Sequence, residues 1–98
     1  MHPAITLDAL RVLDAIERRG SFQAAAEALF RVPSALTYTV QKLESELGVS
    51  LFDRSRQRAQ LTAAGRLLLE RGRLLLQDAA DLEEAVKQLE SGWELTLR

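Results

Sequence analysis

The chain has 98 residues, a net charge of −1, an apolar share of 47% and no cysteine. Its length suits one domain with a modest core and a helix that projects from it. The lack of cysteine excludes a disulfide framework and a zinc–cysteine site, and the single histidine, His2, cannot anchor a metal alone. No apolar run approaches the roughly 20 residues of a membrane span. Asp8 and Arg11 interrupt the early apolar stretch, so we expect no signal peptide, no membrane partner and a cytoplasmic protein.

Charge is unevenly distributed along the chain. Residues 1–73 carry eleven Lys or Arg against eight acids, whereas residues 74–98 carry two against six. Two stretches, 28–43 and 54–69, contain no acid at all. Their basic residues are Arg31, Lys42, Arg54, Arg56, Arg58 and Arg66. Such gaps are expected where a surface approaches nucleic-acid phosphates, with chance as the alternative.

Two helices are predicted first. Thr6 can cap the first helix, and Gly20 ends it after a stripe of apolar residues. The stripe consists of Leu7, Leu10, Leu13 and Ile16, with Val12 alongside. Ser21 can cap a second helix over Phe22–Leu29, whose alanines suit close helix packing, and Phe30 and Arg31 then form a turn.

A third helix is predicted from Pro33, which suits a first helical position, to Leu47, with Gly48 as its stop. Its core stripe is Leu36, Val40, Leu43 and Leu47. On the opposite face, uncharged hydrogen-bonding side chains recur at helical spacing beside one lysine. They are Ser34, Thr37, Tyr38, Gln41 and Lys42. Such groups can touch base edges and phosphates together; the alternative is a face that water merely solvates.

A short hairpin is expected next. Phe52–Ser55 and Ala59–Thr62 suit two strands around the tip at residues 56–58, although the tip lacks the Asn-Gly or Asp-Gly of a tight turn. Arginines on this ribbon could enter a narrow A·T minor groove. The alternative is a solvated loop that contacts phosphates only.

The last segment predicts a long helix capped by Thr62. Apolar or small residues recur along it at alternating spacings of three and four, which is a heptad seam. The seam consists of Gly65, Leu68, Gly72, Leu75, Ala79, Leu82, Val86, Leu89 and Trp93. We expect its first half to pack on its own domain as well as on a partner. A helix of about 30 residues spans ~45 Å, more than a domain of about sixty residues covers, which favours a homodimer over an intramolecular helix. Parallel and antiparallel pairings both remain open.

These elements predict a mainly α fold, a winged helix–turn–helix over residues 1–62 followed by a dimerisation helix over 63–93. The domain would consist of three helices and a short β-hairpin wing. We find no nucleophile–base, phosphate-loop or paired-carboxylate arrangement, so we do not expect an enzyme.

One ordered set of motifs covers nearly the whole chain. It consists of Ser21-Phe22 with Ala24-Ala25-Ala26-Glu27 and Leu29, Pro33-Ser34-Ala35-Leu36-Thr37, Val40 with Leu43-Glu44 and Leu47-Gly48-Val49, Leu51-Phe52-Asp53-Arg54, and Leu61-Thr62 with Ala64-Gly65. This set resembles the N-terminal domain and linker helix of LysR-type transcriptional regulators. The resemblance implies a sequence-specific, dimeric binder of double-stranded DNA that recognises an interrupted palindrome, with a tetramer as an alternative in the full-length protein. It also implies that residues 94–98 begin a hinge to an effector domain. That domain would bind a small molecule, and this chain itself would need no cofactor.

The expected site residues follow from the faces above together with this resemblance. The DNA-binding residues are Arg31, Pro33, Ser34, Thr37, Tyr38, Gln41, Lys42, Arg54, Arg56 and Arg58. The dimerisation residues are Leu68, Gly72, Leu75, Ala79, Leu82, Val86 and Leu89. The chain departs from the family pattern at Val32-Pro33, Tyr38 and Gln57, where Ser-Gln, Arg and Arg are common, so no base code is transferred.

Two other interpretations stay open. The N-terminal domain of molybdate-responsive regulators is similar and would keep the DNA role with a different ligand. A coiled-coil interaction module would use the small domain only as a scaffold. The salt dependence of binding to duplex DNA separates the two, because a pure interaction module would show no steep dependence.

Overall fold

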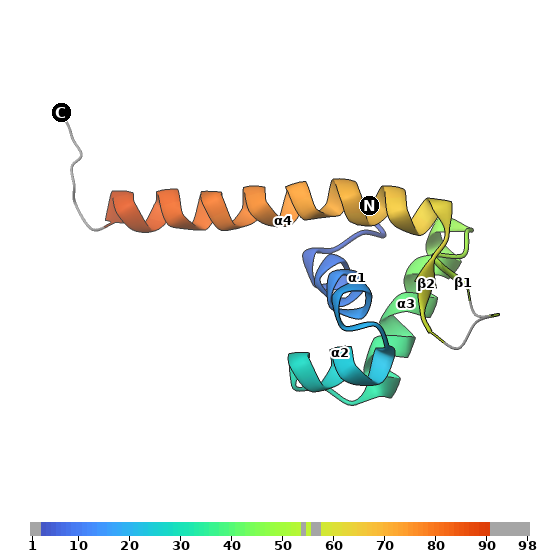
Figure 1. Cartoon of the computed structure of the whole chain (residues 1–98). Helices are drawn as coiled ribbons and strands as arrows, with labels where there is room; N and C mark the ends of the chain where they lie inside the picture. Colours follow the sequence, from blue (N-terminus) through green and yellow to red (C-terminus); the bar gives the residue numbers. More distant parts are fainter. Residues whose placement is uncertain (1–2, 54, 56–57, 91–98) are drawn as a thin grey trace.

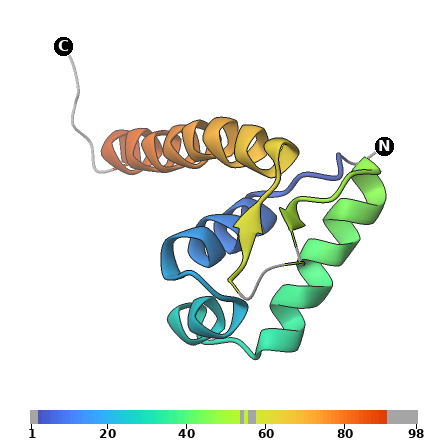
Figure 2. The same ribbon diagram turned by 45° about the vertical axis from the view of Figure 1, so that its right-hand side comes forward.

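The computed structural model describes residues 3–53, 55 and 58–90. The elements follow in the order α1 (Leu7–Arg19), α2 (Phe22–Leu29), α3 (Pro33–Leu47), β1 (Phe52–Asp53), β2 (Gln60–Leu61) and α4 (Ala63–Glu90). The first three helices form a compact group, the two strands form a hairpin beside it, and α4 lies across α1 (Figures 1 and 2). This is the mainly α, winged helix–turn–helix architecture with a long following helix that the sequence predicts.

Local signals set the helix bounds, as predicted. The Thr6 hydroxyl accepts a hydrogen bond from the Ala9 N–H at 3.0 Å. The Ser21 hydroxyl caps α2 in the same way, accepting from the Ala24 N–H at 3.0 Å. Gly20 ends α1 in the left-handed region at φ 88°, where a side chain would be strained. These caps satisfy backbone groups that helix ends would otherwise leave unpaired.

The core lies between the three short helices and the start of α4. Its buried side chains come from α1 to α3, from the segment after α3 and from α4. They include Leu13, Ile16, Ala25, Ala26, Leu36, Val40, Leu43, Leu51, Phe52 and Leu69. The rings of Phe22 and Phe52 meet edge to face at 5.4 Å between centroids, which joins α2 to the hairpin.

The predicted core stripe of α3 was wrong at one end, since Leu47 lies in the last helical turn and is 38% exposed. Leu7, which begins the apolar stripe of α1, lies in the first turn and is 41% exposed. Leu47 instead lines an open, apolar groove with Val49 and Leu67. The stripes are therefore buried only where a neighbouring element packs over them.

The strands are shorter than predicted. They pair antiparallel with Phe52 opposite Leu61 and Asp53 opposite Gln60. At the end of β1, the Asp53 carboxylate accepts from the Ser55 N–H at 2.9 Å, a side-chain hydrogen bond typical of turns. At the other end, Thr62 leaves the strand to cap α4, where its hydroxyl accepts from the Gly65 N–H at 3.0 Å.

Small residues let α4 approach the rest of the domain. A Cβ on Gly65 would collide with the carbonyl oxygen of Leu51, and a Cβ on Gly72 would lie 2.6 Å from Leu10 Cδ2. Arg73 then joins α4 to α1, since its Nε donates to Asp14 at 2.7 Å and its Nη2 donates to Glu17 at 3.2 Å. The 28 residues of α4 span ~42 Å, and its C-terminal part runs on past α1 (Figure 1).

In the described part of the chain, no helix combines the length and hydropathy that crossing a bilayer requires. The last helix is described to Glu90, so the predicted end of the seam at Trp93 lies outside the described residues. The same holds for the predicted hinge at residues 94–98.

Candidate nucleic-acid interface

The outer face of α3 presents the polar side chains predicted to contact DNA. Ser34, Gln41 and Lys42 are exposed, Thr37 is half-buried, and Tyr38 is 66% exposed. The opposite face of the same helix is buried in the core through its apolar stripe. The structure therefore brings the polar side chains together on one accessible face, held by a packed helix.

The N-terminus of α3 has no side-chain cap. Its N-cap residue, Val32, makes no side-chain capping hydrogen bond, and Pro33 at the first helical position has no N–H to satisfy. Pro33 and Ser34 are both exposed. The partial positive charge of a helix N-terminus favours phosphate at such a place.

Both predicted cations beside this face have acidic partners. Lys42 Nζ lies 3.6 Å from Glu46, one turn further along α3. The Arg31 guanidinium binds the Asp8 carboxylate, with 3.1 Å between Nη1 and Oδ2. The hydrogen bond from Arg31 lowers the pKa of Asp8, against a smaller opposing effect of partial burial.

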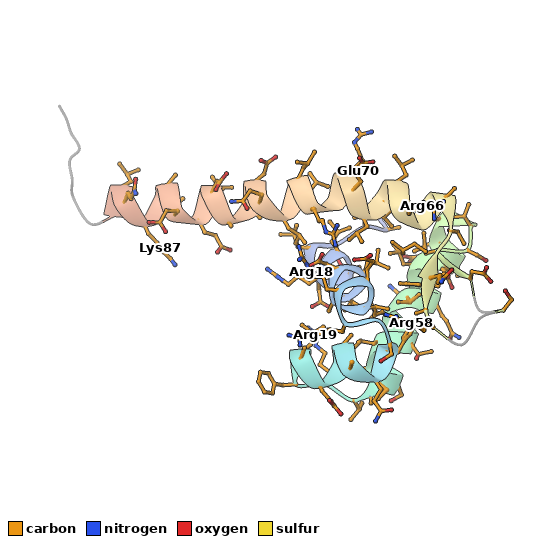
Figure 3. The ribbon with its side chains drawn as sticks, in the orientation of Figure 1. Arg18, Arg19, Arg58, Arg66, Glu70 and Lys87 are labelled. Carbon is orange, nitrogen blue, oxygen red and sulfur yellow. The ribbon has the colours of Figure 1, made fainter. Side chains whose placement is uncertain are left out.

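The hairpin provides one described arginine. The Arg58 guanidinium lies against Gly20, between the hairpin and the end of α1 (Figure 3). A side chain at Gly20 would collide with it. Helix C-termini favour cations, so this packing suits the charge. Arg54, Arg56 and Gln57 lie outside the described residues, and their roles stay predictions.

The structural role of Glu44 is not indicated by the sequence patterns. The Glu44 carboxylate on α3 accepts the backbone N–H of Leu51 at 2.7 Å and that of Phe52 at 3.4 Å. It thereby fixes the start of the hairpin relative to α3. The available signal was that Glu44 is the first acid after the acid-free stretch of residues 28–43.

The predicted dimer seam divides into two parts. Leu68 is half-buried and Gly72 is buried, and Gly72 faces Leu10 of the same chain. Further along α4, Ala79 is half-buried, whereas the larger apolar side chains are exposed. The exposed fractions are 49% for Leu75, 66% for Leu82, 58% for Val86 and 76% for Leu89.

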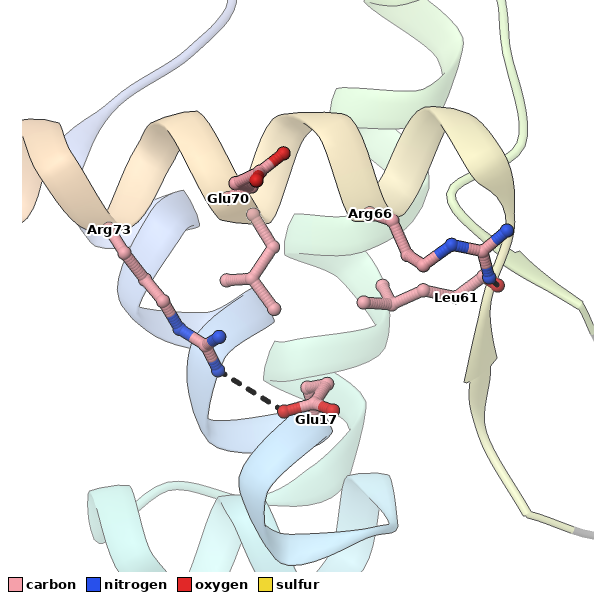
Figure 4. A pocket seen from close by; sticks show the side chains of 6 residues that line it. Glu17, Leu61, Arg66, Glu70 and Arg73 are labelled. Atoms are coloured by element: carbon pink, nitrogen blue, oxygen red, sulfur yellow. Dashed lines mark hydrogen bonds and ion pairs between the residues drawn. The ribbon is translucent and has the colours of Figure 1, made fainter.

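A cleft between α1, β2 and α4 holds two further arginines (Figure 4). Arg66 donates to the Leu61 carbonyl at 3.1 Å, and Arg73 binds Asp14 and Glu17. Both guanidinium groups are thus engaged within the domain. Among the described residues, no group of three or more His, Cys, Asp or Glu is placed to hold a metal ion.

Comparison with known proteins places these features in a family. Residues 7–66 match the model described as bacterial regulatory helix-turn-helix protein, lysR family. The chain is 62% identical over 94 residues to YhaJ, a probable HTH-type transcriptional regulator of Escherichia coli (strain K12). That match covers 96% of this chain and 32% of YhaJ, so the chain spans about a third of that relative.

Solved structures of similar fold include two DNA complexes. The BenM_DBD/catB site 1 DNA complex superimposes with a TM-score of 0.88 at 27% identity, covering 93% of this chain and 98% of that one. The CbnR_DBD–DNA complex gives a TM-score of 0.81 at 31% identity, covering 88% of this chain and 99% of that one.

Proposed function

We propose that this chain, which belongs to the lysR family of bacterial regulatory helix-turn-helix proteins, binds double-stranded DNA in a sequence-specific manner as a homodimer. The observation that carries the proposal is the outer face of α3. It gathers accessible, uncharged hydrogen-bonding side chains on a helix of a fold that superimposes on two DNA-bound domains. The protein would act in the cytoplasm, where it reaches DNA, and would regulate transcription rather than catalyse a reaction.

Each group on this face has a distinct proposed role. Ser34, Thr37, Tyr38 and Gln41 contact base edges in the major groove, where hydrogen-bond patterns differ between base pairs. Pro33 brings the backbone close to the DNA, and the helix N-terminus and Lys42 contact phosphates. In the hairpin, Arg54, Arg56 and Arg58 approach the flanking backbone or minor groove.

The dimer forms through α4. The seam residues Leu75, Leu82, Val86 and Leu89 are exposed in a single chain, and burial against a second copy would remove them from water. Leu68, Gly72 and Ala79 complete the proposed seam. Two linked readers would recognise half-sites about one helical turn, or a multiple of it, apart. Inserting about five base pairs between half-sites should then weaken binding more than inserting about ten.

The whole protein's activity goes beyond this chain. We propose that a further domain binds a small-molecule effector and that this chain needs no cofactor. The lysR match favours this assignment over a molybdate-responsive regulator. A tetramer is an alternative for the full-length protein.

Salt dependence tests DNA binding itself. A dimer that makes ~6–10 phosphate contacts should lose ~10³–10⁵ in affinity between about 50 and 200 mM salt. The measurement is a titration of a duplex selected from a random-sequence pool. An interaction module that uses the small domain as a scaffold would give no steep dependence, and that result would overturn the proposal.

A further inference from the structure

The turn between α2 and α3 carries an ion pair that local sequence patterns do not show. Arg31 follows the left-handed residue Phe30, and its N–H donates to the Ala26 carbonyl at 2.9 Å. Both terminal nitrogens of its guanidinium bind the two carboxylate oxygens of Asp8, which lies 23 residues earlier in the first turn of α1. Two parallel bonds hold the planar groups in one orientation.

This pair lies at the edge of the proposed DNA-binding face. Arg31 stands two residues before Pro33, the first residue of α3. Asp8 lines a shallow groove together with Tyr38 and Lys42 of α3. The fold therefore places a carboxylate beside a segment, residues 28–43, that has no acid of its own.

Both members of the pair are open to an approaching polyanion. The Arg31 side chain is 38% exposed and the Asp8 side chain is 46% exposed. A phosphate that approaches Arg31 therefore also meets the negative charge of Asp8. The repulsion from Asp8 offsets much of the attraction to Arg31, because the two charges lie within one hydrogen bond of each other.

We propose that Asp8 competes with DNA phosphates for Arg31 and so weakens the binding of this chain to duplex DNA of arbitrary sequence. The inference rests on the proposed DNA-binding function. Asp8 acts through Arg31 and is a positioning residue rather than a contact. Because phosphate contacts provide most of the affinity for non-specific DNA, withholding one cation per chain lowers that affinity while base contacts remain.

The test compares two variants that remove the same charge. Asp8→Asn breaks the pair with Arg31. Asp81→Asn is the matched control, since Asp81 lies on the distal part of α4 and accepts from the Gln77 amide at 2.9 Å. The probe is a labelled random-sequence duplex of about 30 base pairs, whose binding is followed by anisotropy from about 50 to 200 mM salt.

Freeing Arg31 should strengthen binding to the random duplex at about 50 mM salt and steepen its salt dependence. One added phosphate contact per chain steepens the slope of log affinity against log salt concentration by ~0.9. Between about 50 and 200 mM salt, this is a further loss of affinity of roughly threefold per chain. Asp81→Asn should match the wild type in slope. An Asp8→Asn protein whose affinity and slope equal those of the Asp81→Asn control, or whose affinity is lower, would overturn the proposal.

A double variant tests whether Asp8 acts through Arg31. In an Arg31→Ala background, Asp8→Asn should no longer change the slope. If the full change persists there, Asp8 repels DNA without Arg31, and the proposed competition is wrong. Thermal unfolding by circular dichroism confirms that each variant is folded. If the wild type binds neither this duplex nor the duplex selected from a random-sequence pool, the proposed function fails, whereas binding without the Asp8 effect defeats only this inference.

Discussion

Replacing Leu82 by Ala tests whether α4 forms the dimer. Leu82 lies midway along the exposed part of the seam and is 66% exposed in the single chain. Fully burying a Leu side chain contributes ~1.5–3 kcal/mol, so burying the exposed two thirds contributes ~1–2 kcal/mol per copy. The side chain acts twice in a symmetric dimer, which gives ~2–4 kcal/mol, or a rise in the dimer dissociation constant of roughly 30- to 900-fold.

The chain offers a matched control for this measurement. Leu74 is 63% exposed on the same helix but lies beside the seam rather than in it. Sedimentation equilibrium of Leu82→Ala and Leu74→Ala gives both dissociation constants, and circular dichroism verifies that each variant keeps its helices. Equal constants for the two variants, or a Leu82→Ala protein that dimerises as tightly as the wild type, would refute the seam.

Three further predictions concern the domain itself. Gly65→Ala should lower the melting temperature although Ala favours helices by ~1 kcal/mol, because its Cβ would collide with the Leu51 carbonyl; a higher melting temperature would contradict this. Glu44→Ala should lower the free energy of unfolding by ~1–3 kcal/mol, because it leaves the Leu51 N–H without its acceptor. Glu44→Gln retains an acceptor, so its free energy of unfolding, measured by urea titration, should fall less. Arg31 lowers the pKa of Asp8 in the folded state, so the stabilisation by this pair is present above the ordinary pKa of Asp and is lost as pH falls through the lowered value. The difference in melting temperature between wild type and Asp8→Asn should therefore be largest near neutral pH and vanish in strong acid, and a constant difference would count against the pair.

Much of this fold could be predicted because its signals are local. Thr6 and Ser21 accept from N–H groups three residues ahead, and Gly20 and Gly48 end their helices in the left-handed region. Capping depends on neighbouring residues alone, so the sequence carries the information directly. The polar face of α3 could be predicted for the same reason, since helical spacing fixes which side chains share a face.

The parts that could not be predicted depend on distant contacts. Leu47 fits the apolar period of α3, yet its burial depends on whether another element covers the last turn, and it is 38% exposed. The partner of Arg31 comes from 23 residues away in α1. Likewise, only the folded chain places the Arg58 guanidinium against Gly20. Pattern and spacing give no information about such pairs.

The most direct measurement of the central claim is the base preference of two threonine variants of α3. Thr37 lies on the proposed base-reading face, whereas the Thr39 hydroxyl donates to the Ala35 carbonyl at 3.0 Å within the same helix. Binding to every single-base variant of a selected operator should show that Thr37→Ala loses discrimination at particular positions, at ~1–3 kcal/mol for a good base contact. Thr39→Ala should keep the wild-type preferences. If Thr37→Ala instead weakens binding equally to operator and random duplex, the face of α3 does not read bases, and the account is contradicted.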